Sequence, residues 1–290
     1  MTTTGTTTTG KTTTGTTTTS TTTTSKTTTG LPRALARHRP RPMTSWRLEW
    51  LRLTRSRRWI ALVAVYLVFG LIGPVMAKYM AGLLEHVQSG ITIIVPAPQP
   101  KDGIVNYLSQ VGQIGLIVVV AIAAGAMSFD AHRGISTFLR TRANGMWELV
   151  APRFTVNAVA AVLAYALGLL AAWYETALLL GPLPVGPMLA GLLCESVYLV
   201  FAVAVVAASA SFARGTLGTV GIALAVLIVL SIVGSLGAVH DWLPSTLSGA
   251  TVELLSTTQL SDYTRSLLVA AGVGALLLWL AAFRLRRREV

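Results

Sequence analysis

The chain has 290 residues, of which 53% are hydrophobic and only 12% are charged, and its 23 basic residues outnumber its 11 acidic ones. A soluble domain carries about 25% charged residues, so this composition excludes an ordinary soluble globular domain. The single cysteine, Cys194, excludes an intrachain disulfide and a metal cluster built on cysteines.

The first 30 residues contain 21 threonines, with only Gly, Ser, two lysines and Met1 besides. They include GTTTTGKT at residues 5–12, which matches the phosphate-binding P-loop pattern. A P-loop needs a buried strand before it and a helix after it, whereas threonines flank this match on both sides. We therefore interpret the match as spurious and expect no enzymatic activity and no ATP site in this chain. Residues 1–44 are predicted to be a disordered cytoplasmic tail, Thr-rich and then Arg/Pro-rich.

The stretch SWRLEWLRLTRSRRW, residues 45–59, predicts an amphipathic helix. Trp46, Trp50 and Leu53 fall at i, i+4 and i+7 and share one helical face, while Glu49 and Arg52 lie off that face. Tryptophans on one side and arginines on the other are typical of a helix that lies in the plane of a membrane. The alternative is a basic flank that only orients the first membrane span.

Six apolar stretches approach the roughly 20 residues that a helix needs to cross a bilayer. They cover about residues 59–80, 104–128, 149–180, 187–212, 217–239 and 265–283. The sequence therefore predicts an all-α polytopic membrane protein, with residues 45–290 forming one six-helix transmembrane domain. With the N-terminus in the cytoplasm, 20 of the 23 basic residues lie inside and only Lys78, Lys101 and Arg265 lie outside. The positive-inside rule thus places both termini in the cytoplasm.

The loop between the second and third spans, residues 128–154, predicts a short helix of its own. Ser128 suits a helix start, Ala131, Ile135 and Phe138 share one face, and Asn144 with Gly145 indicates a turn. A charged helix joined to two spans is suited to dock a cytoplasmic partner and to transmit its movement. The alternative is a loop whose positive charge only sets the orientation.

With a basic Trp/Arg/Glu helix, six spans, this loop and a re-entrant-looking segment before the sixth span, the chain resembles an ABC-2 type permease, the membrane subunit of a type-2 bacterial ABC exporter. In such permeases the loop after the second span opens with an acidic residue, followed by Arg and Gly, a Leu-rich stretch and another Arg. The matching residues here are Asp130, Arg133, Gly134, Leu139 and Arg142. The family often has Glu at the first position and Thr after the Gly, where this chain has Asp130 and Ile135.

The resemblance implies a homodimer, or a dimer with a related permease, in the lipid bilayer of the bacterial plasma membrane. Two separate ATP-binding cassette ATPase subunits would bind below it and would hold the ATP and Mg. The loop would be the coupling helix, with Asp130, Arg133, Gly134, Thr137, Arg140 and Arg142 against the ATPase. No nucleic-acid partner is expected.

Two sets of polar residues within the spans are candidates for lining a transport pathway. Asn106, Gln110 and Gln113 fall at i, i+4 and i+7 in the second span, and lipid would disfavour such a stripe. The alternative is that this helix protrudes into solvent. Ser231 and Ser235 fall at i and i+4 in the fifth span, where small residues also serve close helix packing.

Glu175 and Glu195 are the clear acids within the spans, on either side of the predicted outer turn GPLPVGP, residues 181–187. They are candidates for receiving a cationic substrate or carrying protons. Alternatively, Glu175 reaches the headgroup layer and Glu195 makes a hydrogen bond to another helix. Residues 240–266 predict either a partly re-entrant cap or a plain surface loop.

Three functions compete on the sequence. The first is the permease subunit of an ATP-driven exporter, and a largely apolar pathway suits an amphipathic or lipid-like substrate. The second is a membrane scaffold, immunity component or sensor that transports nothing. The third is a secondary transporter or channel. Such a protein is expected to carry a relay of buried charged residues, and the spans contain only two clear acids. Hydrolase motifs such as H-E-x-x-H and G-x-S-x-G are absent, and the four histidines are too scattered to predict a metal site.

Overall fold

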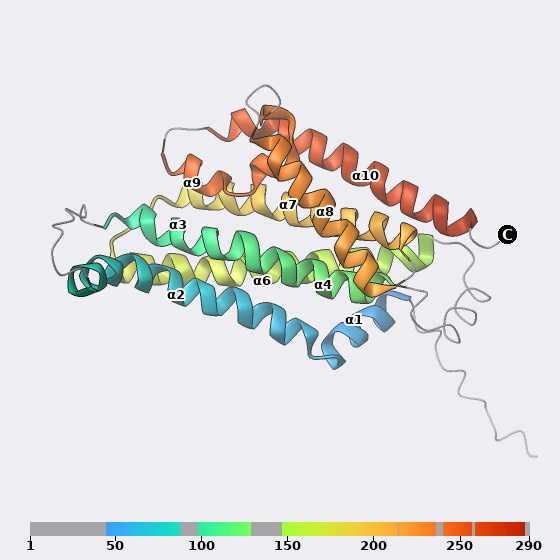
Figure 1. The fold of residues 1–290 in the computed structure, drawn as a ribbon, viewed down its shortest axis with the longest axis horizontal. Helices are drawn as coiled ribbons and strands as arrows, with labels where there is room; N and C mark the ends of the chain where they lie inside the picture. Colours follow the sequence, from blue (N-terminus) through green and yellow to red (C-terminus); the bar gives the residue numbers. More distant parts are fainter. Residues whose placement is uncertain are drawn as a thin grey trace, which may run out of the picture. The chain divides into compact units, whose positions relative to one another are not determined.

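The computed structural model describes residues 45–87, 98–128, 147–213, 215–235, 240–256 and 259–287. The chain divides into two units, Met1–Arg41 and Pro42–Val290, and every described residue belongs to the second. Regular structure in these ranges is entirely helical (Figure 1). The predicted tail with its P-loop match and the predicted coupling helix, residues 129–146, lie outside the described residues.

The described chain forms α-helices, one π-helix and short 3-10 turns. The helices that form or flank the spans are α1 (Ser45–Arg55), α2 (Arg58–Val87), α3 (Pro100–Gln110), α4 (Leu116–Met127), α6 (Trp147–Leu179), α7 (Val185–Phe212), α8 (Thr216–Gly234) and α10 (Thr264–Arg287). A π-helix, η1 (Val111–Gly115), joins α3 to α4. The segment before α10 holds the 3-10 turns η3 (His240–Trp242), η4 (Pro244–Leu247) and η5 (Leu260–Tyr263) and the short helix α9 (Ala250–Leu254).

Six helical stretches of the described chain are long and apolar enough to cross a membrane. They are Arg58–Met80, Pro100–Met127, Val150–Leu179, Val185–Phe212, Thr216–Gly234 and Leu260–Leu285. Each coincides with one predicted span, and most ends agree within a few residues. The fifth helix ends at Gly234 rather than at the predicted 239. The chain is therefore an all-α, multi-pass membrane protein, as the sequence predicts.

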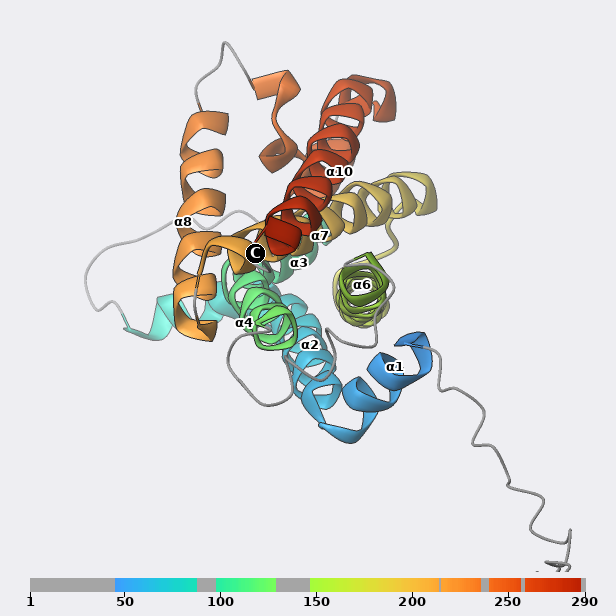
Figure 2. The same ribbon diagram turned by 90° about the vertical axis from the view of Figure 1, so that its right-hand side faces the viewer.

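Helix α7 lies in the middle of the six spans. It packs against α4, α6, α8, α9 and α10, and in the view along the spans it lies among them (Figure 2). In its most apolar stretch 61% of the residues are buried, against 22% for α8. Its run of Ala, Val and Ser from Ala202 to Ser209 is buried on every side of the helix, because small side chains let neighbouring helices approach closely.

Helices α2 and α6 cross at two glycines. A Cβ on Gly70 would lie 2.5 Å from the carbonyl oxygen of Gly168, and a Cβ on Gly168 would lie 2.7 Å from that of Tyr66. Beside this crossing, the ring of Tyr165 lies 6.0 Å from the ring of Tyr66 and 6.3 Å from that of Tyr107. The aromatic cluster thereby holds α2, α3 and α6 together.

The six spans give the bundle two ends, which we name after the short helices that mark them (Figure 1). The α1 end holds α1, the starts of α2, α6 and α8, and the ends of α4, α7 and α10. The α9 end holds α9, the start of α3 and the turn between α6 and α7. By the distribution of basic residues, the α1 end is the predicted cytoplasmic end.

The second span is interrupted by the π-helix η1. Gly115, its last residue, packs so closely on Tyr66 that a Cβ there would lie 3.0 Å from the ring carbon Cζ. Single π-turns inside α-helices occur frequently at functional sites. Here the π-turn lies where the second span meets a cavity that is partly open to the surroundings.

Candidate functional site

A cavity of about 350 Å³ lies toward the α9 end of the bundle. Its walls come from α3, η1, α6, α7 and the segment 248–252. Leu108, Val111 and Val252 make much of the wall apolar, while Ser109 and Ser248 add hydroxyl groups. Glu195 contributes the one carboxylate among the described lining residues, so the cavity combines an apolar wall with a single acid.

Glu195 lies on α7, ten positions after the helix start at Val185, which places it roughly 15 Å along the helix at 1.5 Å per residue. It is 6% exposed, and its Oε2 accepts a hydrogen bond from the backbone N–H of Gly249 at 3.3 Å. Among the described residues, no basic side chain forms an ion pair with it. A carboxylate accepts about four hydrogen bonds, so much of its acceptor capacity is left to the cavity.

The segment from η4 to α9 descends to the depth of Glu195. Gly249 has φ +89°, a left-handed conformation that favours glycine, and directly precedes α9 as its N-cap. Ser245 donates a hydrogen bond to the Leu230 carbonyl of α8 at 3.2 Å, and Leu247 and Leu254 are buried. These contacts support the re-entrant alternative over the surface loop, since non-helical backbone at membrane depth must be covered by protein or face water.

Two buried hydroxyl groups lie near the cavity. The side chain of Tyr165 lines the cavity and is fully buried, and Thr251 is 1% exposed. The two hydroxyls are near each other, yet neither makes a hydrogen bond of good geometry to any described residue. A buried polar group without a partner costs about 1–3 kcal/mol. Both hydroxyl oxygens are shielded by the protein, so the hydroxyl groups open to a bound molecule are those of Ser109 and Ser248.

At the α1 end, one arginine joins three helices. Arg153 of α6 is 5% exposed, and its Nε donates to Oε1 of Glu49 on α1 at 2.8 Å. Its Nη1 donates to the carbonyl oxygen of Ala126 near the end of α4 at 3.4 Å. We call these contacts the α1 junction. Arg52, which is more exposed, approaches the same Glu49 at 3.7 Å.

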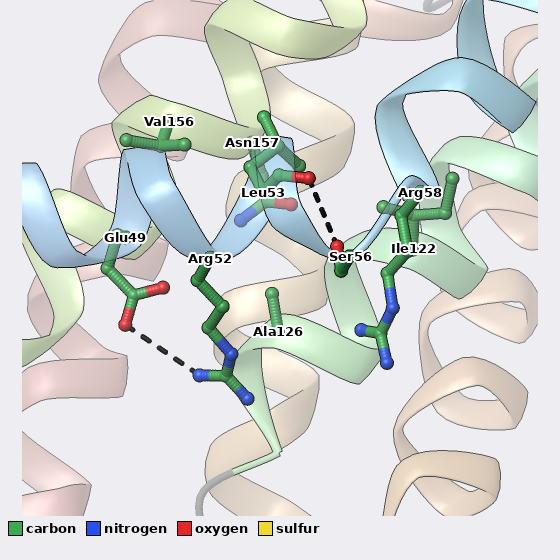
Figure 3. A pocket seen from close by; sticks show the side chains of 9 residues that line it. All are labelled: Glu49, Arg52, Leu53, Ser56, Arg58, Ile122, Ala126, Val156 and Asn157. Carbon is green, nitrogen blue, oxygen red and sulfur yellow. Dashed lines mark hydrogen bonds and ion pairs between the residues drawn. The ribbon is translucent and has the colours of Figure 1, made fainter.

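A small pocket of about 70 Å³ lies beside the α1 junction (Figure 3). Glu49, Arg52 and Ser56 reach it from the α1 side, Ala126 from α4 and Asn157 from α6. Asn157 donates to the Arg153 carbonyl at 2.8 Å, which ties this wall to the junction. The pocket thus marks where α1 packs on the spans.

The orientation of α1 agrees in part with the sequence prediction. Trp46 and Trp50 are 51% and 48% exposed, so the tryptophan face is open to the surroundings, as an interfacial helix requires. Glu49, which the pattern places off the tryptophan face, turns toward the spans. The pattern of residues 45–59 cannot predict this contact, because the partner Arg153 lies 104 positions away.

The predicted polar stripe of the second span is not the surface that faces the cavity. Asn106 is half-buried and donates to the Asp102 carbonyl of its own helix at 3.1 Å. Gln110 is half-buried and lies directly before the π-turn, and Gln113 is exposed within it. None of the three lines the cavity, whereas Ser109 does. An i, i+4, i+7 pattern assumes a continuous α-helix, which this span is not.

The remaining predicted residues lie apart from the cavity or outside the described residues. Ser231 and Ser235 are exposed on α8, and Gly234 between them packs against the Ser245 side chain. Glu175 is half-buried, and its Oε2 makes no hydrogen bond to the described residues. The predicted coupling-helix residues Asp130, Arg133, Gly134, Thr137, Arg140 and Arg142 lie outside the described residues.

Within the described ranges, no three His, Cys, Asp or Glu side chains come together in a way that could hold a metal ion. The α1 junction and the cavity are the two arrangements of side chains from several spans on which the functional argument depends.

Comparison with known proteins places the chain among transmembrane proteins. It is similar to the uncharacterized transmembrane protein YxlG of Bacillus subtilis, with 22% identity over 158 residues. The match covers 53% of this chain and 61% of that protein, so the chain spans about three fifths of the length of this curated relative. No protein-family model and no solved structure matches the chain.

Proposed function

We propose that the chain is the membrane subunit of an ATP-driven exporter of the ABC-2 type, with ATP bound and hydrolysed on a separate ATPase subunit. The observation that carries the proposal is the α1 junction. Arg153 holds the beginning of α6 to α1 and to the end of α4, and residues 129–146, predicted as the coupling helix, connect these same two spans. A partner that moves this segment would therefore move both spans together.

Both of these spans lead from the junction to the cavity. Helix α4 continues through η1 into α3, where Val111 and Ser109 line the cavity, and α6 contributes Tyr165. Closure of an ATPase pair below the α1 end would thus act on the cavity walls. The membrane subunit would then have two conformations, and ATP bound to the ATPase subunit would shift the equilibrium between them. The cavity is accordingly the proposed substrate site.

The proposal includes the assembly that the resemblance implies. The chain would act as a homodimer, or as a dimer with a related permease, in the bacterial plasma membrane. The α1 end would face the cytoplasm and the ATPase subunits, which would carry the ATP and Mg. The large share of exposed residues on α8 leaves ample surface for lipid or for such a neighbour.

The first test is purification of the chain from its native membrane in a mild detergent after crosslinking, with mass spectrometry of the proteins that accompany it. We expect an ATPase with a P-loop in stoichiometric amount. Absence of any ATPase from the crosslinked complex would overturn the proposal. The cavity acid Glu195 would then favour the secondary-transporter alternative, and a partner without a P-loop would favour the scaffold.

The second test reverses one charge in the predicted coupling helix. Arg133→Glu is expected to abolish stimulation of the partner's ATPase activity by the membrane subunit in proteoliposomes, because it opposes the predicted docking charge. Lys101→Glu makes the same charge change at the α9 end and is expected to leave the stimulation intact. If Arg133→Glu stimulates the partner's ATPase activity as strongly as Lys101→Glu does, the docking assignment is contradicted.

A further inference from the structure

The charge of the cavity indicates what it would hold. Glu195 brings a carboxylate to membrane depth, and the described residues supply it with the Gly249 N–H and no cation. Ionisable groups inside a membrane are costly unless they are paired or face a water-filled cavity. A positively charged ligand in the cavity would supply the missing charge.

The size and the walls of the cavity indicate the rest of that ligand. A volume of about 350 Å³ falls within the range of roughly 300–1,000 Å³ typical of small-molecule pockets. Leu108, Val111 and Val252 suit an apolar body, and an inorganic ion would leave their surfaces uncovered. The occupant that fits both features is a small organic molecule with one positive charge.

The hydroxyl groups strengthen this assignment. Ser109 and Ser248 bring accessible hydroxyl groups to the cavity wall, of which the buried Tyr165 side chain also forms part. Hydroxyl oxygens accept hydrogen bonds from a protonated amine and turn partial negative charge toward any cation. An anion would instead be repelled by the Glu195 carboxylate. A neutral lipid would leave the charge of that carboxylate uncompensated.

We propose that this cavity binds an organic monocation with an apolar body, with Glu195 as its counter-charge and the hydroxyl groups of the wall as acceptors. That this cation is also the transported substrate rests on the proposed function. That the cavity binds it rests on the cavity alone, so binding is tested on the chain without an ATPase.

The test uses two ions of nearly equal shape and opposite charge. Equilibrium dialysis of the purified full-length chain in detergent measures binding of tetraphenylphosphonium and of tetraphenylborate. We expect saturable binding of the phosphonium at one ion per chain and no saturable binding of the borate. Equal binding of the two ions would show that charge is not recognised and would overturn the proposal.

The decisive variant is Glu195→Gln, which removes the charge and keeps an oxygen that accepts the Gly249 N–H. Phosphonium affinity is expected to fall at least roughly tenfold, which corresponds to about 1.4 kcal/mol. Glu175→Gln removes an acid from α6 outside the cavity wall and is expected to bind as the unmodified chain does. Unchanged affinity of Glu195→Gln would overturn the proposal.

A second variant covers the case in which Glu195→Gln does not fold. Ser109 is exposed on α3 and lines the cavity, so Ser109→Lys would bring a tethered ammonium to it without disturbing the core. We expect this variant to lose phosphonium binding and Ser109→Met, of similar length but uncharged, to retain it. Equal binding by the two would count against the proposal, while the test for a partner ATPase stays independent of this result.

Discussion

At the residue scale, the pair of Glu49 and Arg153 joins two positions that lie 104 residues apart. Arg153 is almost fully buried, so its charge needs the compensation that Glu49 provides at 2.8 Å. Arg52 approaches the same carboxylate from a more exposed position, at 3.7 Å. The two arginines with the same partner thus differ in burial and geometry, so mutation of Glu49 removes the charge from both contacts and mutation of Arg52 removes only the exposed one.

Glu49→Gln is expected to destabilise the purified protein by about 1.5–3 kcal/mol, because it removes the charged acceptor of a buried arginine. Arg52→Gln, which removes the exposed pair, is expected to cost about 0–1 kcal/mol. Thermal unfolding in detergent, followed for both variants beside the unmodified chain, measures the difference. A Glu49→Gln variant as stable as Arg52→Gln would contradict the role of the junction.

Single residues are easier to predict from the sequence than their partners. Glu195 stands out as an intramembrane acid, because a carboxylate in an apolar run is conspicuous. Gly249, Tyr165 and Thr251 carry no such signal, because a glycine, a tyrosine and a threonine are unremarkable in their own segments. The folding of the segment before α10 onto α7 brings the Gly249 N–H to the acid, and the packing of α6 brings Tyr165 to the same cavity.

At the scale of elements, α9 depends on a close approach to α7. A Cβ on Gly191 would lie 2.2 Å from Oγ1 of Thr251, a distance that real side chains do not adopt. Because Thr251 is buried, it cannot swing into solvent to relieve such a clash. The position of α9 along α7 is therefore set by the absence of a side chain at one residue.

Gly191→Ala is expected to displace α9 and to destabilise the protein by about 1–3 kcal/mol, the usual range for overpacking. Gly186→Ala, on the same helix with nothing within 4 Å of the added Cβ, is expected to be neutral or stabilising, since alanine favours a helix. Melting temperatures of the two variants test this contrast. A stable Gly191→Ala variant would mean that α9 is not held against α7 as described.

The six spans could be predicted from the sequence because length and apolar composition alone decide whether a helix can cross a bilayer. The π-turn at Val111–Gly115 could not, because its hydrogen-bond register depends on how Gly115 packs against Tyr66 in another span. The predicted end of the fifth span, residue 239, lies beyond the observed end of α8 for a related reason. Residues 235–239 are apolar enough to continue the pattern, but Gly234 packs on Ser245 and the helix ends there.

At the scale of the whole molecule, the distribution of basic residues predicts which end faces the cytoplasm, and engineered cysteines test it. The native Cys194 is fully buried and would be replaced by serine. A cysteine at Ser256, exposed at the α9 end, is expected to react with a membrane-impermeant maleimide in intact cells. A cysteine at Ser56, exposed at the α1 end, is expected to react only after the cells are permeabilised. The reverse pattern would invert the predicted orientation.

The π-turn in the second span also has a consequence for how such a protein changes over generations. Each residue of an α-helix turns the chain by about 100°, so one residue lost from Val111–Gly115 would rotate the whole of α3 relative to α4 by about that angle. Ser109 and Leu108 would leave the cavity and other side chains of α3 would enter it. A single codon deletion or insertion at this point would therefore replace one wall of the cavity at once, where point mutations would have to change it residue by residue.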